Sequence, residues 1–105
     1  MGFFRRGRRG GNISAADAAY LQHWVHTHYG VEGYIEPKTT VTEVTVVLIA
    51  HDGEWTRRIV GERGAMRLST ELKIPVYDVR KTGYPQRMRD FDARRKILER
   101  RLRKE

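Results

Sequence analysis

Hydrophobic and polar positions first indicate a β-hairpin in the middle of the chain. Residues 40–49, TVTEVTVVLI, are mostly β-branched, and residues 46–49 are apolar at every position. A short run of this kind predicts a central strand that is covered on both faces. The turn residues 51–54 follow, and the Asp-Gly pair among them favours a hairpin because both residues tolerate positive φ. Residues 55–60 then form the returning strand, with alternate side chains on opposite faces.

The segment before this hairpin predicts a helix and a short strand. Residues 14–17, Ser-Ala-Ala-Asp, have the form of a capping box, in which the serine hydroxyl accepts a hydrogen bond from a main-chain amide of the first turn. We expect this helix to run to about Tyr29 and to stop at Gly30. A strand should follow at residues 31–36, ended by Pro37, which cannot donate to a ladder. The helix positions expected to face the core are Ala18, Leu21, Trp24, Val25 and His28.

After the hairpin, the pattern predicts two further helices and one strand. Residues 62–73 form a helix with Arg63 and Arg67 on its outer face, and residues 76–79 form a strand. The inward positions of that helix are Ala65, Leu68, Ser69 and Leu72. After a turn at residues 81–85, residues 86–104 are helical by composition. Apolar residues recur along this last helix as a narrow stripe that can dock it on the body: Met88, Phe91, Leu98 and Leu102.

These elements predict an α+β fold. We expect a two-layer sandwich of order α-β-β-β-α-β-α, with a mainly antiparallel sheet of about four strands and the first two helices on one face. The basic terminal helix should lie across an edge or the other face. At 105 residues the chain is long enough for one modest core. We divide it into a flexible Arg- and Gly-rich arm at residues 1–13, a core at residues 14–85 and a basic helix at residues 86–105.

The net charge of +8 is concentrated at the two ends of the chain. Residues 1–13 hold four arginines and no acid, which gives +4, and residues 80–105 hold 11 basic and 4 acidic side chains, which gives +7. Residues 14–79 hold 6 basic and 9 acidic side chains, which gives −3. Charge segregated in this way indicates a polyanionic partner, nucleic acid above all.

Cysteine is absent, and the first residues lack the apolar core of a signal peptide. The sequence also has no apolar segment of about 20 residues. We therefore expect a reducing, cytoplasmic setting with no membrane partner.

The candidate binding residues are the basic side chains of the arm, the returning strand, the second helix and the last helix, with one aromatic ring for stacking. Arginine forms bidentate contacts with phosphate, and aromatic rings stack on bases. Together they are Arg5, Arg6, Arg8, Arg9, Arg57, Arg58, Arg63, Arg67, Tyr84, Arg87, Arg89, Arg94, Arg95, Lys96, Arg100 and Arg101. Trp55 is a second candidate for stacking.

Enzymatic and metal sites have weaker support in the sequence. His23, His26 and His28 do not share one helix face, and no carboxylate joins them at a ligand spacing, so we expect no bound metal. No nucleophile elbow or phosphate-binding glycine motif is present, and we expect no cofactor. A magnesium-dependent nuclease remains an alternative, with its carboxylates drawn from Glu43, Asp52, Glu54 and Asp78.

Two resemblances bear on these expectations. The order helix, three strands, helix resembles a double-stranded-RNA-binding domain, whose second helix would present Arg63 and Arg67 to phosphates, although that family's lysine-rich helix start is missing here. The segments VEGY at 31–34, DGEWTRR at 52–58 and GYPQRMRD at 83–90 resemble a family of small, basic, functionally uncharacterised actinobacterial proteins. That resemblance covers about residues 14–92. It implies a shared fold and an intracellular bacterial setting, and it transfers no activity.

The hypothesis we carry forward is non-catalytic binding of structured RNA through phosphate contacts, with the ribosome as one setting. DNA binding is the near alternative. A different class also stays open, in which the protein docks on an acidic protein of the transcription or translation machinery. Its anchors would be the turn at residues 83–85 and the apolar stripe of the last helix.

Overall fold

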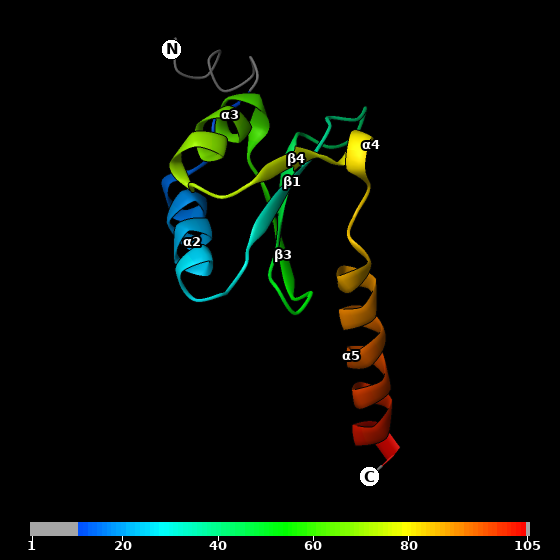
Figure 1. Ribbon diagram of the computed structural model, residues 1–105. Coiled ribbons are helices and arrows are strands. Elements are labelled where there is room, and N and C mark those ends of the chain that lie inside the picture. The colour runs from blue at the N-terminus through cyan, green and yellow to red at the C-terminus, as the bar shows by residue number, and fades with distance from the viewer. Residues whose placement is uncertain (1–10, 105) are drawn as a thin grey trace.

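The computed structural model describes residues 11–104, which form four helices and a four-stranded mixed sheet. The helices and strands, in chain order, are α2 (Ala15–His26), β1 (Glu32–Glu36), β2 (Thr45–Ile49), β3 (Trp55–Ile59), α3 (Gly61–Glu71), β4 (Val76–Asp78), α4 (Val79–Thr82) and α5 (Gln86–Lys104). Figure 1 shows α2 and α3 together on one side of the sheet and α5 on the other. The predicted α+β class is confirmed.

The sheet has the strand order β3-β2-β1-β4, so β2 is an interior strand as predicted. The β2–β3 hairpin is antiparallel, with Ile49 opposite Trp55, and β1 pairs antiparallel with β2. Gly53 has a φ of +94° in the hairpin turn, the conformation that favours glycine. The fourth strand, β4, runs parallel to β1, which makes the sheet mixed.

The main core lies between the sheet and helices α2 and α3. Val46 and Leu48 point from β2 toward these helices and are at most 2 % exposed. They pack with Leu21 and Trp24 of α2 and Leu68 of α3. The amphipathic spacing of both helices therefore places their apolar stripes on one face of the sheet, as the sequence predicted.

A smaller cluster covers the opposite face of the sheet. Val47 and Ile49 of β2 are fully buried there against Tyr34 and Met88, and Trp55 packs beside them. Met88 belongs to the first turn of α5, so this helix covers the second face of β2. The full apolarity of residues 46–49 is thus explained by helices on both sides.

The N-terminal boundary of the packed body differs from the prediction of an arm that ends at residue 13. Ile13 is only 7 % exposed and belongs to the main core. The carbonyl oxygen of Gly11 accepts a hydrogen bond from the Arg63 amide, and Ile13 lies against Gly64. Residues 11–13 are therefore part of the body, because they cap and cover the start of α3.

Several element ends also differ from the sequence predictions. The predicted Ser14 cap is confirmed, since its Oγ accepts from the Asp17 amide at 3.1 Å. Helix α2 ends at His26, before Tyr29. The amide and the hydroxyl of Thr27 cap it by donating hydrogen bonds to the carbonyl oxygens of His23 and Trp24. Strand β2 begins only at Thr45, since hydrogen bonds between Thr39 and Thr42 turn the preceding chain. Ser69, predicted to face inward, is exposed and donates to Met66 O.

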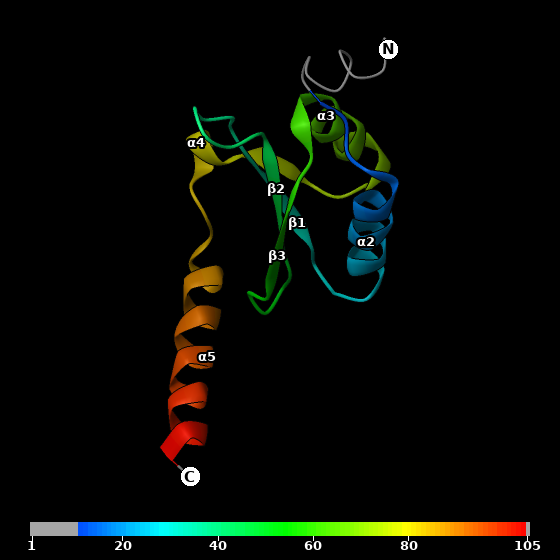
Figure 2. The same ribbon diagram turned by 180° about the vertical axis from the view of Figure 1, so that it is seen from behind.

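Among residues 11–104, the contacts between helix α5 and the body come only from the first half of the helix. Its buried residue is Met88, and Phe91 and Asp92 are half-buried. Beyond them every described residue of the helix is exposed, including Leu98 and Leu102. Figures 1 and 2 show that the C-terminal half extends away from the sheet, which accounts for a longest dimension of 55 Å. The prediction that the whole stripe docks the helix is therefore wrong beyond Phe91.

Candidate nucleic-acid interface

The structure separates the candidate binding residues into groups with different surroundings. Arg5, Arg6, Arg8 and Arg9 lie outside the described residues, so the structure gives them no contacts. The remaining candidates lie on β3, on α3, in the turn before α5 and along α5.

The two β3 arginines are held by the body on opposite faces of the sheet. Arg57 forms a bidentate ion pair with Glu36, with Nε to Oε1 at 2.8 Å and Nη2 to Oε2 at 2.9 Å. Arg58 lies over the Tyr20 ring, 3.9 Å from its centroid, and 3.6 Å from Asp17. Both guanidinium groups therefore have intramolecular partners, which connect β3 to β1 through Glu36 and to α2 through Asp17 and Tyr20.

Glu36 is the centre of a hydrogen-bonded cluster that also holds Tyr84. The carboxylate accepts from Arg57, from the Thr45 hydroxyl and from the Tyr84 hydroxyl. Burial raises the pKa of Glu36, but these three hydrogen bonds outweigh burial and leave its pKa below the ordinary value. Burial, followed by the Glu36 contact, raises the pKa of the Tyr84 phenol. Tyr84 is thus half-buried and tied to the strand, and its ring is not presented freely for base stacking.

Trp55 is also held by a hydrogen bond to another element. Its Nε1 donates to Asp92 Oδ1 at 2.9 Å, and its ring packs against the second cluster. This hydrogen bond joins β3 to α5. Trp55 therefore belongs to the joint between sheet and helix.

Arg87 joins α5 to the sheet through hydrogen bonds. Its Nε donates to the Ala50 carbonyl at 2.9 Å, and its Nη2 donates to Glu32 Oε1 at 2.7 Å. The hydrogen bond from Arg87 lowers the pKa of Glu32 despite partial burial. Its neighbour Arg89 is exposed and donates to Gln86 Oε1. Of these two candidates, Arg89 is the one that faces solvent.

The α3 arginines are on the outer face, as the sequence predicted. Arg63 and Arg67 are both exposed, and Arg67 pairs with Glu71 one turn later at 2.8 Å. Within residues 11–104, Arg63 forms no ion pair. Arg63 lies in the first turn of α3, where a positive charge opposes the helix dipole.

The C-terminal half of α5 carries the largest set of exposed basic groups. Arg94 donates to the Asp52 carbonyl at 2.9 Å, which is the last hydrogen bond from this helix to the described body. Arg95 lies 3.7 Å from Asp92. The basic residues after them form no ion pair with any described residue: Lys96, Arg100, Arg101, Arg103 and Lys104. This segment presents positive charge that the described protein does not neutralise.

The charges of α5 are arranged on distinct sides of the helix. At about 100° per residue, the charged side chains opposite Phe91 form a basic face, which consists of Arg89, Lys96, Arg100, Arg103 and Lys104. The Phe91 side carries the apolar stripe, with Arg94, Arg95 and Arg101 around it. Arg103 was not among the predicted binding residues, although its helical spacing from Arg100 and Lys96 would have placed it on this face.

The groups considered for metal and acid chemistry are dispersed. No three His, Asp or Glu side chains within residues 11–104 are grouped as metal ligands. Glu43 pairs with Lys38, Glu54 with His28, and Asp78 with Arg80. Arg80 lowers the pKa of Asp78 to about 2 through side-chain and backbone hydrogen bonds. Asp52 accepts from the Glu54 amide in the hairpin turn.

The comparisons with known proteins returned no relative. No protein-family model matches the chain, and no curated protein or solved structure matches it. The similarity to small actinobacterial proteins therefore stays a prediction. Among the helices of the described part, none is long and apolar enough to cross a membrane.

Proposed function

We propose that the protein is a non-catalytic module that binds structured RNA through phosphate contacts. The observation that carries this proposal is the basic face of α5, on a helix that projects from the body (Figure 2). Lys96, Arg100 and Arg103 follow one another along this face with no carboxylate partner among the described residues. Binding of a polyanion would release its condensed counterions and neutralise this charge.

The composition of the basic face supports backbone contacts over base reading. Its side chains are arginine and lysine, whereas base-specific recognition in a DNA groove also draws on amide and carboxylate side chains. Double-stranded RNA is recognised mainly by shape and by contacts with phosphates and 2′-hydroxyls. Phosphate contacts do not distinguish RNA from DNA, and we propose RNA because its duplexes are recognised mainly through such backbone contacts.

The other exposed basic groups extend this surface in the proposal. Arg63 adds a charge on α3, and Arg89 begins the basic face of α5. The arginines of the N-terminal arm lie outside the described residues. We include them in the proposed surface because arginine forms bidentate contacts with phosphate. By contrast, Arg57, Arg58 and Arg87 act through the fold, because each is already bound by a neighbour.

The experiment is a direct comparison of RNA and DNA. A fluorescently labelled RNA hairpin and a DNA hairpin of the same sequence are titrated with the full chain in the same buffer, and binding is followed by anisotropy. We expect tighter binding to the RNA, and protection of its backbone from hydroxyl-radical cleavage where α5 lies. Equal or tighter binding to the DNA would replace RNA with DNA in the proposal. Absence of binding to both at low salt would remove the proposal.

The ribosome is the first cellular setting to test. The tagged full chain is sedimented with cell extract through a sucrose gradient, with and without ribonuclease. Co-sedimentation with ribosomal subunits that ribonuclease abolishes would support this setting. A protein found only at the top of the gradient would argue against it.

A further inference from the structure

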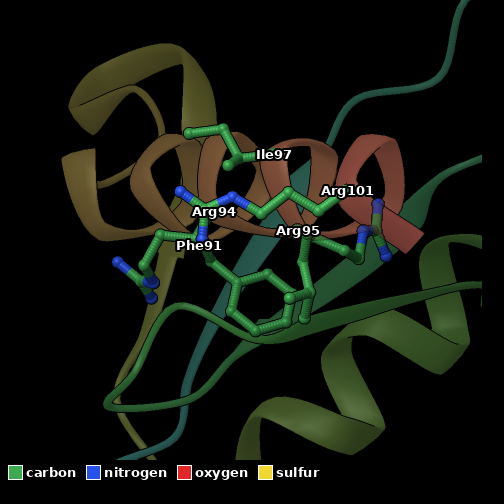
Figure 3. A pocket seen from close by; sticks show the side chains of 6 residues that line it. Phe91, Arg94, Arg95, Ile97 and Arg101 are labelled. Carbon is green, nitrogen blue, oxygen red and sulfur yellow. The ribbon is translucent and has the colours of Figure 1, made fainter. Parts of the chain in front are cut away.

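The apolar stripe on the projecting half of α5 has no cover among the described residues. Leu98 is 58 % exposed and Leu102 is 64 % exposed, and Ile97, beside the stripe, is 42 % exposed. Phe91 begins the stripe and is half-buried. A shallow hollow lies along this side, and all its lining residues belong to α5: Phe91, Arg94, Arg95, Ile97, Leu98 and Arg101 (Figure 3). Within residues 11–104, the hollow is therefore lined by α5 alone, and the rest of the described body does not cover it.

The spacing of the stripe is that of a helix-to-helix seam. Phe91, Arg95, Leu98 and Leu102 are separated by four, three and four residues, the spacing of positions d, a, d and a of a heptad. A helical segment of about ten residues in water gains little stability by itself. A partner that covers the stripe would both bury the leucines and hold this segment in helical form.

The charges around the stripe define what kind of partner fits. Arg94 and Arg95 have their guanidinium carbons 5.9 Å from the centre of the Phe91 ring, and Arg101 lies along the same hollow (Figure 3). Arg95 occupies an a position, in line with the leucines, and Arg94 and Arg101 occupy flanking g positions. Arg94 already donates to the Asp52 carbonyl, and Arg95 lies 3.7 Å from Asp92. When the stripe is covered, the remaining N–H groups of these two arginines and those of Arg101 lose water, and carboxylates from the partner would pair with them. An apolar ridge bordered by acidic residues meets both requirements.

A second copy of this chain fits less well. Parallel pairing would set Arg94 near Glu99 of the second copy, but it would also place two Arg95 side chains together in the seam. Antiparallel pairing would oppose the flanking Arg94 and Arg101 side chains. In either orientation, two chains of net charge +8 would meet along their basic helices.

A membrane or a nucleic acid also fits this side of α5 less well. An interfacial helix needs a broad apolar face, whereas here Arg95 interrupts a narrow one. Phosphates would bind more favourably to the basic face, on the other side of the helix, than to the apolar stripe. The two sides of α5 therefore suit two different ligands.

We infer that the apolar stripe of α5 is a docking site for an amphipathic helix of another protein, with apolar side chains at the seam and carboxylates that pair with Arg94, Arg95 and Arg101. The inference is independent of the proposed RNA binding. It uses the opposite side of the helix and a different chemistry.

The probe is a synthetic peptide of about three heptads with leucine at a and d and glutamate at e and g. Mutual repulsion of the glutamates keeps such a peptide from pairing with itself at neutral pH. Binding to the full chain is measured by fluorescence anisotropy, beside a control peptide with lysine at e and g. We expect at least about tenfold preference for the glutamate peptide. Equal binding of both peptides, or of neither, would overturn the inference.

Substitutions on the stripe test where the peptide binds. Because Leu98 and Leu102 are exposed, replacing both with serine should leave the fold intact, as checked by thermal unfolding. The double variant should weaken binding of the glutamate peptide by at least about tenfold. Changing Arg95 and Arg101 to glutamate should invert the preference toward the lysine peptide. Unchanged affinity in the serine variant would overturn the inference.

A matched control separates this site from the proposed RNA surface. Lys96→Glu with Arg100→Glu reverses the same number of charges on the basic face, and we expect it to keep at least half of the peptide affinity. The same control variant should lose RNA binding, whereas the serine variant should keep it. If the wild-type chain binds the glutamate peptide but no RNA, the proposed function alone has failed.

Two further outcomes would assign the stripe to another occupant. Sedimentation equilibrium of the chain alone should show a monomer, and a dimer that the serine variant abolishes would replace the partner helix with a second copy. Vesicles of phosphatidylserine should not bind more tightly than the glutamate peptide. Tighter vesicle binding that depends on Leu98 and Leu102 would assign the stripe to a lipid surface.

Discussion

Gly53 and Arg87 meet backbone to backbone at the joint between the β2–β3 hairpin and α5. A Cβ atom on Gly53 would overlap the main-chain carbonyl of Arg87, and it would also lie 2.9 Å from the Cβ of Phe91. The glycine has a φ of +94°, which a side chain would make costly as well. The hairpin turn therefore fits under the first turns of α5 only because residue 53 has no side chain.

Gly53→Ala should consequently loosen the attachment of α5. We expect a loss of at least about 3 kcal/mol in the free energy of unfolding, from backbone strain together with the clash. Denaturant unfolding measures the loss, and hydrogen exchange at residues 86–94 should become faster. Gly83→Ala is the matched control, because Gly83 also has a positive φ but nothing lies near its Cβ position. It should cost about 1–2 kcal/mol, and an equal loss in both variants would contradict the role of the contact.

Ile13→Ala tests whether the body begins at residue 11. Ile13 is 7 % exposed and packs against α3, so its truncation should leave a cavity and cost about 2–4 kcal/mol. Thermal or denaturant unfolding measures this loss. Val41→Ala removes two carbons from a residue that is 87 % exposed and should change stability by less than about 0.5 kcal/mol. If Ile13→Ala leaves the free energy of unfolding unchanged, residues 11–13 belong to the arm and not to the packed body.

The Glu36 cluster predicts a dependence of stability on pH. The pKa of Glu36 in the folded protein lies below its ordinary value of 4.5, so the unfolded chain binds more protons near that pH. The contribution of Glu36 is therefore present above about pH 4.5 and is lost as the pH falls through the lowered folded pKa. Glu32, whose pKa Arg87 lowers, acts in the same direction.

Glu36→Gln should reduce this acid sensitivity. We expect the variant to be about 1–3 kcal/mol less stable at neutral pH and to lose less stability than the wild type on acidification. Urea unfolding at a series of pH values measures both effects. Glu71→Gln, on an exposed helical ion pair, should change stability by less than about 0.5 kcal/mol. An acid dependence that is the same in Glu36→Gln and wild type would show that Glu36 is not responsible.

Local sequence signals predicted much of the fold. The Ser14 cap, the Asp52-Gly53 turn and the β-branched run of β2 act through neighbouring residues, so their elements could be located from the sequence. The parallel pairing of β4 with β1 could not, because it depends on how the chain returns across the sheet after α3. The packing of Ile13 against α3 is likewise a contact between distant segments.

The candidate site was less predictable for the same reason. Arg57 and Arg87 have the composition of phosphate-binding residues, but their partners, Glu36 and Ala50, are 21 and 37 residues away. An apolar stripe also has the same sequence pattern whether another segment packs against it or it is exposed to solvent. Only the structure shows that the body contacts α5 as far as Arg94 and leaves Leu98 and Leu102 exposed.

The salt dependence of RNA binding is the sharpest test of the proposed RNA surface. The slope of log K against log salt for an RNA duplex is compared between wild type and the triple variant Lys96→Gln, Arg100→Gln, Arg103→Gln. The control is Lys38→Gln, Arg67→Gln, Arg80→Gln, which removes the same charge from residues already paired with Glu43, Glu71 and Asp78. We predict that the first variant flattens the slope by up to about 3, one unit for each phosphate that is no longer neutralised, while the control keeps it nearly unchanged. Equal slopes in the two variants would contradict the claim that the basic face of α5 binds the RNA backbone.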